Sequence, residues 1–371
     1  MAGRRLIGVI IILVAALASG PVLAAGADVF EVRDIAVDVT AKTAAAAREQ
    51  AISQGQQAAF RRLLERLTLS TDHGNLPQFE AGEITPFVND FSISDEKTSA
   101  VRYLAKLHFR FKADDIRRLL RDAGLQFAET PSKPVLVLPV FQSAGGLVLW
   151  EDPNPWRDAW NRRQSRSGLV TLALPLGDFN DISAVNVEQA VRGEVDALGN
   201  LATRYHAGDS VVAYARLGLN PDGQGQRVDV SVTRFSPHHE PDTKLMALDQ
   251  QGQETVEALL KRAADSVAAS LEDQWKRDNL LTGGESGVAA VTVPITSLAD
   301  WLRVQKKLRS VAVVRSIETV LMSLDEVRVN LHYVGAAQQL QTALGQSDLS
   351  LVREENEWVL YPAGTVPATK R

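Results

Sequence analysis

The pattern of hydrophobic and polar positions divides the chain into two end regions with the same order of elements and a different region between them. Residues 28–39 alternate apolar and polar side chains, as expected for a half-buried strand. A helix capped by Thr43 follows, and its apolar stripe comprises Ala47, Ala51, Ala58, Ala59, Leu63 and Leu67. The remaining elements of this region are two strands, a short helix and a further strand, at residues 87–93, 103–111, 115–123 and 125–127. This βαββαβ order predicts a ferredoxin-like module over residues 28–130.

The last region repeats this order of elements. Its predicted strands, helices and terminal hairpin lie at residues 291–295, 298–308, 311–320, 327–333, 336–344 and 349–361. With a gapless offset of 224 residues, Leu107-His108-Phe109 aligns with Leu331-His332-Tyr333. An internal duplication would produce this match, and so would two unrelated segments with elements of equal length. Either explanation predicts a second βαββαβ module over residues 288–362, with a linker at 282–287 before it and a disordered tail at 363–371 after it.

The central region, residues 133–281, has a different pattern. The run from Val135 to Leu138 is apolar at every position, which predicts a strand covered on both faces. The other predicted strands and helices of this region lie at residues 169–174, 187–205, 211–219, 227–233, 244–248 and 256–275. The turn signal Asn220-Pro221-Asp222-Gly223 joins two of these strands into a hairpin. We therefore predict a central three-layer α/β domain, and a mixed α/β (α+β) class for the whole chain.

The first residues have the pattern of a secretory leader. Arg4-Arg5 precede an apolar run from Leu6 to Leu17, and small residues follow up to Ala24. This run is much shorter than the 20 or so apolar residues that a helix needs to cross the hydrocarbon core of a bilayer. Residues 1–24 are therefore expected to be a cleaved signal peptide rather than a membrane anchor. No later segment has the length and apolar character of a membrane span, so we expect a soluble exported protein after cleavage.

Composition excludes several kinds of stabilising device and partner. The chain has no cysteine, which excludes a disulfide framework and a lipid-modified cysteine at the leader junction. Stability must then come from ordinary hydrophobic cores, and 371 residues are enough for two or three domains. The formal net charge is −5, and loss of Arg4 and Arg5 with the leader would make it more negative. Such a surface disfavours nucleic acid and anionic lipid as partners.

Trp150, Trp156 and Trp160 form the most unusual local cluster of the sequence. Together with Asp152 they are the candidate interaction surface, because an exposed indole offers a large apolar area and a hydrogen-bond donor to a peptide or glycan. The same residues also allow a packing interpretation, in which Asn154 caps a short helix and the tryptophans pack onto the sheet. The two interpretations predict opposite burial of the indole rings.

No other set of residues shows a catalytic or metal-binding pattern. His238 and His239 are adjacent, so their side chains point apart, and their spacing matches no zinc motif. Asp178 and Asp181 follow a predicted strand, where α/β sheets often bind ligands, but turns and helix caps have the same composition. The sequence contains neither a Gly-x-Ser-x-Gly nor a His-Glu-x-x-His motif. We therefore expect no metal, no cofactor and no enzymatic activity.

Several features together resemble one family of proteins. They are the leader, the strand and alanine-rich helix over residues 28–67, and the strand over residues 133–140 followed by Trp156 and Trp160. On these residues the chain resembles a bacterial family of exported proteins that is grouped as domain of unknown function 2066. The resemblance covers most of residues 28–280. It implies an exported proteobacterial protein and supplies no catalytic residue.

The leader, the modular ends and the lack of a catalytic motif together predict a non-enzymatic periplasmic protein. We expect it to bind envelope proteins as an assembly or scaffolding factor, with no membrane span after signal cleavage. A periplasmic protein that binds a ligand or glycan through the Trp150–Trp160 segment is the alternative. An enzyme of unrecognised type is the third possibility.

Overall fold

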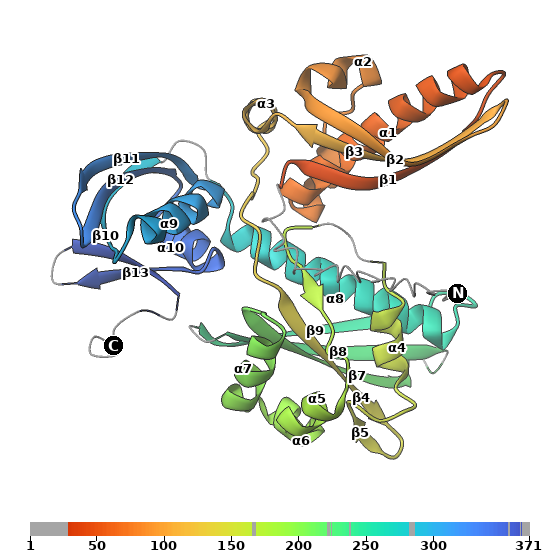
Figure 1. Cartoon of the computed structure of the whole chain (residues 1–371). Helices are drawn as coiled ribbons and strands as arrows, with labels where there is room; N and C mark the ends of the chain where they lie inside the picture. Colours follow the sequence, from red (N-terminus) through yellow and green to blue (C-terminus); the bar gives the residue numbers. More distant parts are fainter. Residues whose placement is uncertain are drawn as a thin grey trace, which may run out of the picture.

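The chain forms three sheets, each packed against helices, so the predicted mixed α/β class is confirmed (Figure 1). The structure is a computed structural model that describes residues 29–164, 168–220, 223, 225–236, 239–281, 286–354, 357–363 and 365. The predicted signal peptide, most of the predicted linker and nearly all of the predicted tail lie outside the described residues.

The N-terminal module packs a long helix against an antiparallel sheet. Its elements are β1 (Glu31–Thr40), α1 (Ala44–Leu67), η1 (Ser70–Asn75), α2 (Ala81–Ile84), η2 (Thr85–Phe87), β2 (Val88–Thr98), β3 (Arg102–Phe111) and α3 (Ala113–Asp122). The sheet order is β1-β3-β2. As predicted, Thr43 caps α1, because its Oγ1 accepts a hydrogen bond from the N–H of Ala46 at 3.2 Å.

Small residues on α1 allow the helix to lie close to the sheet. Ala47, Ala51 and Ala59 are buried as predicted, whereas Ala58 is exposed. Gly55 occupies the closest contact, where a Cβ atom would lie 2.3 Å from Cδ1 of Leu107 in β3. Positions four residues apart lie along one line of a helix, so Gly55 belongs to the buried stripe and Ala58 does not.

The predicted fourth strand of the N-terminal module does not join its sheet. Phe127 makes an isolated antiparallel bridge with Leu281, whose N–H donates to the carbonyl oxygen of Phe127 at 2.8 Å. The N–H of the next residue, Ala128, donates to the carbonyl oxygen of Leu67 at the end of α1. These bonds direct the chain away from β1 and towards the other modules, so the described sheet keeps three strands.

The central module has helices on both faces of a mixed sheet. Its elements are β4 (Val135–Ser143), β5 (Gly146–Val148), α4 (Pro155–Asn161), β6 (Leu172–Ala173), α5 (Phe179–Ala184), α6 (Val187–Arg192), α7 (Val195–Arg204), β7 (Asp209–Leu219), β8 (Gln226–Ser236), β9 (His239–Asp249) and α8 (Val256–Asp278). The sheet order is β5-β4-β7-β8-β9, and β6 also pairs with β4. The strand β4 is parallel to β6 and β7, and the other pairs are antiparallel.

The apolar run that begins β4 contributes to two cores. Val135 and Val137 belong to the core that contains residues of α4 and α8. Leu136 and Leu138 belong to the core that contains residues of α6 and α7. Figure 1 shows α8 on one side of this sheet and α5, α6 and α7 on the other. The strand is thus covered on both faces, as its continuous apolar sequence predicts.

Two predicted elements of the central module are shorter than expected. The helix predicted over residues 187–205 is divided into α6 and α7, because Gly193 ends α6 in the left-handed conformation with φ of 69°. The strand predicted over residues 169–174 is limited to β6. Leu169 and Val170, the first residues of the predicted strand, instead donate their N–H groups to the carboxylate of Glu272 on α8, at 2.7 and 2.9 Å.

The β7–β8 hairpin and the long helix α8 are confirmed. Pro221 and Asp222 of the predicted hairpin turn lie outside the described residues. The strand predicted over residues 244–248 is longer, since β9 begins at His239. His238 lies outside the described residues.

The C-terminal module combines two helices with a five-stranded sheet. Its elements are β10 (Ser286–Pro294), α9 (Leu298–Ser310), β11 (Val314–Met322), β12 (Glu326–Val334), α10 (Ala337–Gln346), β13 (Leu349–Glu354) and β14 (Glu357–Pro362). The sheet order is β11-β12-β10-β14-β13. In a βαββαβ module the fourth strand lies beside the first. Here the fifth strand of the module, β14, takes that place and pairs in parallel with β10. Because the chain turns back after β13, the returning strand of the hairpin is the one that reaches β10.

The offset of 224 residues also relates elements of the two end modules. Helix α3 (Ala113–Asp122) corresponds end for end to α10 (Ala337–Gln346), and β3 begins at the position that corresponds to the start of β12. Both sheets place the third strand of the module between the first and the second. A duplication and two independent modules with elements of equal length would each produce this correspondence.

We expect acid to weaken the C-terminal module through Asp300, which binds the start of α9. Its carboxylate accepts hydrogen bonds from Oγ1 and N of Thr296 at 2.6 and 3.1 Å and from Oγ of Ser297 at 2.8 Å. These bonds lower the pKa of Asp300 from 3.8 to about 2. A folded-state pKa below the unfolded value means that the stabilisation is complete above about pH 4 and is lost as the pH falls towards 2.

Asp300→Asn should therefore lower the unfolding temperature at pH 5 and reduce its dependence on pH between 5 and 2. Circular dichroism of the wild-type and variant chains during heating measures both effects. Parallel pH profiles for the two chains would contradict this role of Asp300.

Candidate functional site

The structure buries the three tryptophans of the candidate interaction surface. Trp156 has 0% of its surface exposed, and Trp150 and Trp160 are also buried. Trp156 and Trp160 lie on α4 and pack edge to face, with ring centroids 5.7 Å apart. Asn154 caps this helix by accepting a hydrogen bond from the N–H of Arg157 at 2.9 Å. The arrangement is the packing interpretation of the segment, and it leaves no exposed indole platform there.

Two of these indoles donate hydrogen bonds inside the fold. Nε1 of Trp156 donates to the carbonyl oxygen of Ala213 in β7 at 2.8 Å, and Nε1 of Trp150 donates to that of Val185 at 2.7 Å. Asp152 is the one member of the candidate surface with an exposed side chain, and it forms an ion pair with Arg157 at 2.5 Å. Asp152 therefore lies beside no exposed indole of the kind that the binding interpretation requires.

Asp178 and Asp181 stabilise the loop around α5. Asp178 caps α5 by accepting from the N–H of Asp181 at 3.0 Å, and this bond helps to lower its pKa. Asp181 is fully buried, and its Oδ2 accepts from Oη of Tyr205 at 2.6 Å and from the N–H of Gly177 at 2.9 Å. Both carboxylates accept hydrogen bonds within this loop and helix, as residues of a turn and a helix cap do.

His108 on β3 and His332 on β12 lie in different modules and contact different partners. Nε2 of His108 is 2.8 Å from Oγ of Ser94, and Nε2 of His332 is 3.5 Å from a carboxylate oxygen of Glu318. In the described part of the chain, no group of three histidine, cysteine, aspartate or glutamate side chains has a geometry that could hold a metal ion.

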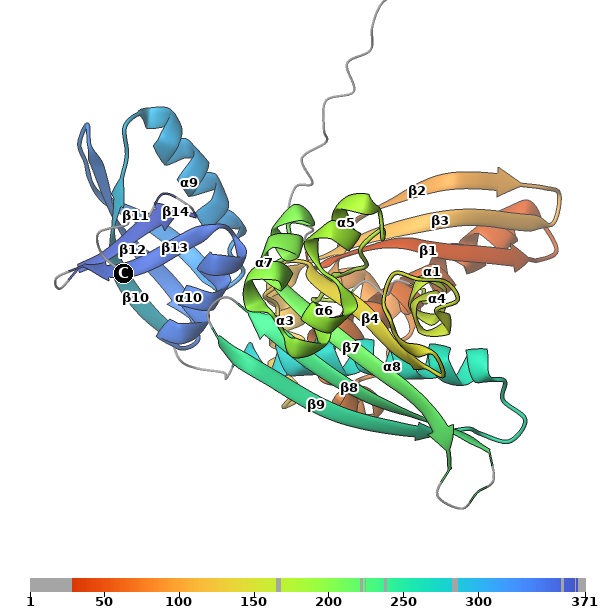
Figure 2. The same cartoon turned by 90° about the horizontal axis from the view of Figure 1, so that it is seen from below.

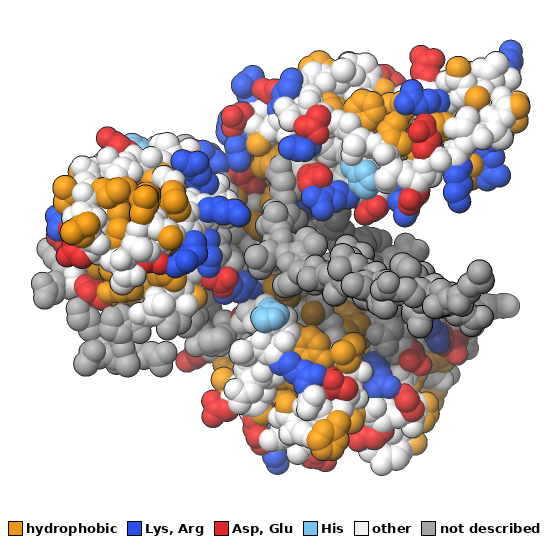
Figure 3. Space-filling model, in the orientation of Figure 1, with side chains coloured by type: hydrophobic (Ala, Val, Ile, Leu, Met, Phe, Trp, Pro, Cys, Tyr) orange, Lys and Arg blue, Asp and Glu red, His pale blue; other side chains and the backbone are white. Residues whose placement is uncertain are grey.

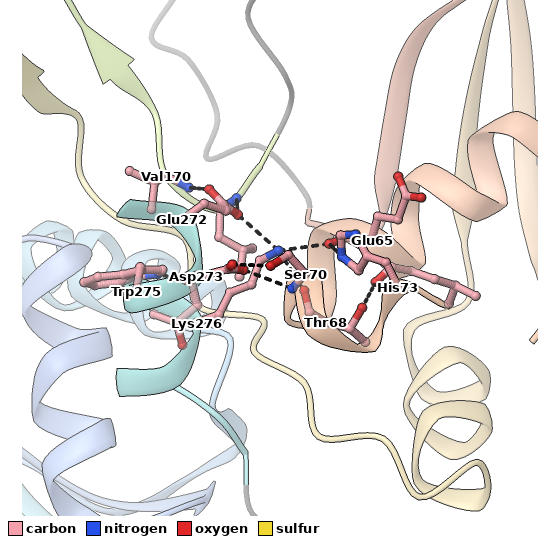
Figure 4. A network of polar contacts seen from close by, with 12 residues as sticks. Glu65, Thr68, Ser70, His73, Val170, Glu272, Asp273, Trp275 and Lys276 are labelled. Carbon is pink, nitrogen blue, oxygen red and sulfur yellow. Dashed lines mark hydrogen bonds and ion pairs between the residues drawn. The ribbon is translucent and has the colours of Figure 1, made fainter. Parts of the chain in front are cut away.

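The end of α8 lies at a junction between the modules (Figure 4). Nζ of Lys276 donates to the carbonyl oxygens of Glu65 and Thr68, at 2.9 and 2.8 Å. These carbonyls are at the C-terminus of α1, where a helix has unpaired acceptors and a partial negative charge. Burial lowers the pKa of Lys276, and the nearby Glu272 carboxylate, at 3.6 Å, opposes this effect.

Two further residues of α8 extend the junction. Asp273 accepts a hydrogen bond from the N–H of Ser70 at 3.0 Å and another from the hydroxyl of Ser70. Nε1 of Trp275 donates to the carbonyl oxygen of Thr130 at 2.7 Å, in the segment that leads from the N-terminal module to the central one. One turn of α8 therefore binds both the end of α1 and the connecting segment.

Glu129 connects the two end modules. Its side chain is fully buried, and Oε2 accepts from Nε of Arg117 on α3 at 2.7 Å. Oε1 accepts from Nη2 of Arg315 on β11, also at 2.7 Å. In the same connecting segment, Lys133 forms an ion pair with Asp348 at 2.6 Å. Directed, charge-assisted bonds of this kind have narrow geometric limits, so they hold the C-terminal module in a defined position.

Sequence reasoning did not identify the junction. Lys276, Asp273 and Glu129 each contact a residue of another module that lies 186 to 211 residues away along the chain. Hydrophobic periodicity reports neighbours within a helix or strand and carries no signal for such pairs.

The C-terminal sheet has an exposed apolar edge. In the described part of the chain β11 has a single neighbouring strand, β12, so its other side is unpaired. Val320, Leu321 and Met322 end this strand and Leu324 follows it; all four are exposed, Val320 to 60% and Leu324 to 95%. We call these four residues the apolar edge. Hydrophobic side chains gather on the visible face of this module (Figure 3).

One edge strand in each of the other two sheets carries residues that disfavour pairing with another chain. The strand β2 contains Asp90, Asp95 and Lys97 and an irregular register before Lys97. The strand β9 contains Pro241 and Lys244. Charges, prolines and bulges are the usual protection of an edge. Bulges also occur in β11, but residues 319–324 contain no charge and no proline.

The first half of β11 has a different character from the apolar edge. It borders a hollow of about 260 Å³ lined by Arg309, Val314, Arg315, Ser316 and Ile317. Two guanidinium groups therefore lie at one end of the strand and the apolar edge lies at the other. A larger cavity of about 400 Å³ in the same module is lined mainly by β10, β12, α10 and β14, with Leu340 and Trp358 among its residues.

Comparison with known proteins finds no family model that matches the chain, and no curated protein or solved structure with significant similarity to it. In the described residues, none of the helices combines the length and the apolar character that crossing a membrane requires.

Proposed function

We propose that this chain is a non-enzymatic exported protein that binds an envelope protein through the apolar edge of its C-terminal module. The observation that carries the proposal is the joint exposure of Val320, Leu321, Met322 and Leu324 at the unpaired side of a sheet. Contiguous exposed apolar side chains mark interaction sites in monomeric proteins. Residues 319–324, at the end of this edge strand, contain no charge and no proline, so this part of β11 is in addition a template for another strand.

The junction supports a scaffolding role. Lys276 and Asp273 bind the end of α1, and Glu129 binds both α3 and β11. The strand β11 begins at this junction, through Arg315, and runs outward to the apolar edge (Figure 2). A partner bound at the apolar edge would thus be held at a defined distance and orientation from the other two modules.

The proposal includes the periplasm as the working location and membership of the exported family grouped as domain of unknown function 2066. The leader pattern of residues 1–24 and the family-like residues over 28–67 and 133–160 support both. We also propose that the end modules are variants of the ferredoxin-like fold, supported by their shared strand order of first, third and second. The glycan-binding alternative loses its support because Trp150, Trp156 and Trp160 are buried.

A photo-crosslinking amino acid at Leu324 in intact cells tests the proposed function. We expect it to capture one defined envelope protein, because this side chain lies at the apolar edge and is almost fully exposed. The matched control is the same amino acid at Leu245, an exposed residue of the protected edge strand β9, and we expect no specific capture there. Absence of capture at Leu324, or the same products at both positions, would contradict the proposal.

A further inference from the structure

We propose that β11 receives an extended segment of the partner as an additional antiparallel strand, and that acidic residues at the C-terminal end of this segment lie beside Arg309 and Arg315. The inference rests on the proposed function and specifies how the apolar edge is recognised. The occupant is a segment of another protein rather than a second copy of this chain. Two copies of β11 paired antiparallel would place the apolar edge of one copy opposite the arginine end of the other, and these two surfaces are not complementary.

The backbone geometry at the end of β11 supports strand addition. Ser323 donates its N–H to the carbonyl oxygen of Glu326 at 2.9 Å, and the next pairs along the ladder are Met322 with Val327 and Leu321 with Arg328. Hydrogen-bonded and non-hydrogen-bonded pairs alternate in an antiparallel ladder. The N–H and C=O of Met322 therefore point away from β12, towards the unpaired side of the strand.

The side chains at this end suit an apolar segment. Val320 and Met322 are both exposed and flank Leu321, and Leu324 extends the apolar surface beyond the strand. Apolar and β-branched side chains of an added strand would pack across from them. We specify antiparallel addition because β10, β12 and β11 already form an antiparallel series and antiparallel pairing is the more stable form.

The charges at the other end of β11 give the segment a direction. A strand antiparallel to β11 begins near Met322 and ends near Arg315. Arg315 contacts Glu129, and together with Arg309 it lines the hollow beside the strand. The chain as a whole is acidic, with a formal net charge of −5, so this basic end is a local exception. Glu318, the one acidic residue of β11, lies near His332 and Asn330. Its charge would repel an acidic residue in the middle of the partner segment, so we expect that part of the segment to be uncharged.

Two synthetic peptides test the inference on the full chain. The probe has the sequence Ile-Thr-Val-Thr-Ile-Thr-Asp-Glu, with apolar residues alternating before an acidic end, and the control has the same residues in reverse order. Both carry a fluorescent group and neutral termini, and binding is measured by fluorescence anisotropy. We expect saturable binding of the probe and at least about tenfold weaker binding of the control, because its acidic end would lie at the apolar edge.

Two substitutions at one position separate backbone pairing from side-chain contact. Met322→Ala removes the side chain and keeps the N–H, whereas Met322→Pro also removes the N–H that points to the unpaired side. We expect the proline variant to bind the probe at least about tenfold more weakly than the alanine variant. Arg309→Glu should weaken binding of the probe and strengthen binding of a peptide whose last two residues are lysine.

Hydrogen exchange in the wild-type chain provides a measurement that does not depend on the folding of a variant. The N–H groups of residues 319–323 should exchange more slowly when the probe is bound, since Met322 acquires a backbone partner. Unchanged exchange there with saturating probe would overturn strand addition.

The remaining outcomes separate this inference from the proposed function. Equal losses of probe affinity in the Met322→Ala and Met322→Pro variants would overturn strand addition, and so would the lack of saturable probe binding. The proposed function would still hold in either case if the crosslinker at Leu324 captures its partner. A concentration-dependent dimer that Met322→Pro dissociates would identify a second copy as the occupant and overturn the inference. Failure of the Leu324 crosslink would instead count against the proposed function itself.

Discussion

Replacing Trp156 with alanine should lower the free energy of unfolding of the central module by about 4 kcal/mol. The side chain is completely buried, packs edge to face against Trp160, and donates a hydrogen bond to the carbonyl oxygen of Ala213. The substitution leaves a cavity between α4 and β7 and a carbonyl group without this donor. Native-state hydrogen exchange of the N–H groups of β4 and β7 measures the free energy of unfolding for this module separately.

Asp152→Ala is the matched control for this experiment. Asp152 lies in the same segment, but its side chain is exposed and its ion pair with Arg157 is at the surface. We expect its substitution to change the free energy of unfolding by less than about 0.5 kcal/mol. A Trp156→Ala variant with wild-type stability and a loss of partner binding would contradict the packing role and restore the aromatic platform.

Glu129→Gln should loosen the attachment of the C-terminal module at a cost of about 3 kcal/mol. The substitution removes the buried negative charge between Arg117 and Arg315, and the amide that replaces it turns one acceptor oxygen into a donor. Each end module keeps its own helices and sheet, so the effect should appear at their connection. We expect faster hydrogen exchange and proteolysis over residues 127–133, whose contacts with both modules depend on this geometry.

Asp114→Asn provides the comparison for Glu129→Gln. Asp114 also contacts Arg117, at 2.7 Å, but its side chain is exposed, so its removal should have an effect below about 0.5 kcal/mol. Equal effects of the two substitutions would mean that burial of Glu129 does not stabilise the junction. An unchanged exchange pattern in the Glu129 variant would lead to the same conclusion.

Much of the fold could be predicted from local patterns. The alternation of β3 and β12, the long apolar stripe of α8 and the continuous apolar run of β4 were each sufficient to predict their elements. These patterns are local because a strand repeats every two residues and a helix every 3.6. Predictions that required a choice between partners were less successful. Phe127 lies in a short apolar segment that predicts a strand, but it pairs with Leu281 instead of with β1.

The candidate site was less predictable than the fold. The tryptophan segment allowed both an exposed and a buried arrangement, and burial in the structure favours the packed one. The apolar edge lies in a strand that was predicted only as far as Val320, and no local pattern distinguishes an edge strand from an internal one. The residues of the junction are ordinary surface types, and their roles arise from partners far along the chain.

The sequence by itself determined the local elements, the absence of cysteine, the acidic charge and the expectation of export, because each depends on composition or on neighbours a few residues apart. Only the tertiary structure decided which strands pair, which apolar side chains remain exposed and which charges meet at the junction. The physical reason is that burial and strand pairing are properties of contacts between distant segments. Leu324 and Trp156 are both apolar residues of the sequence, yet one is almost fully exposed beside an unpaired strand and the other lies in a core.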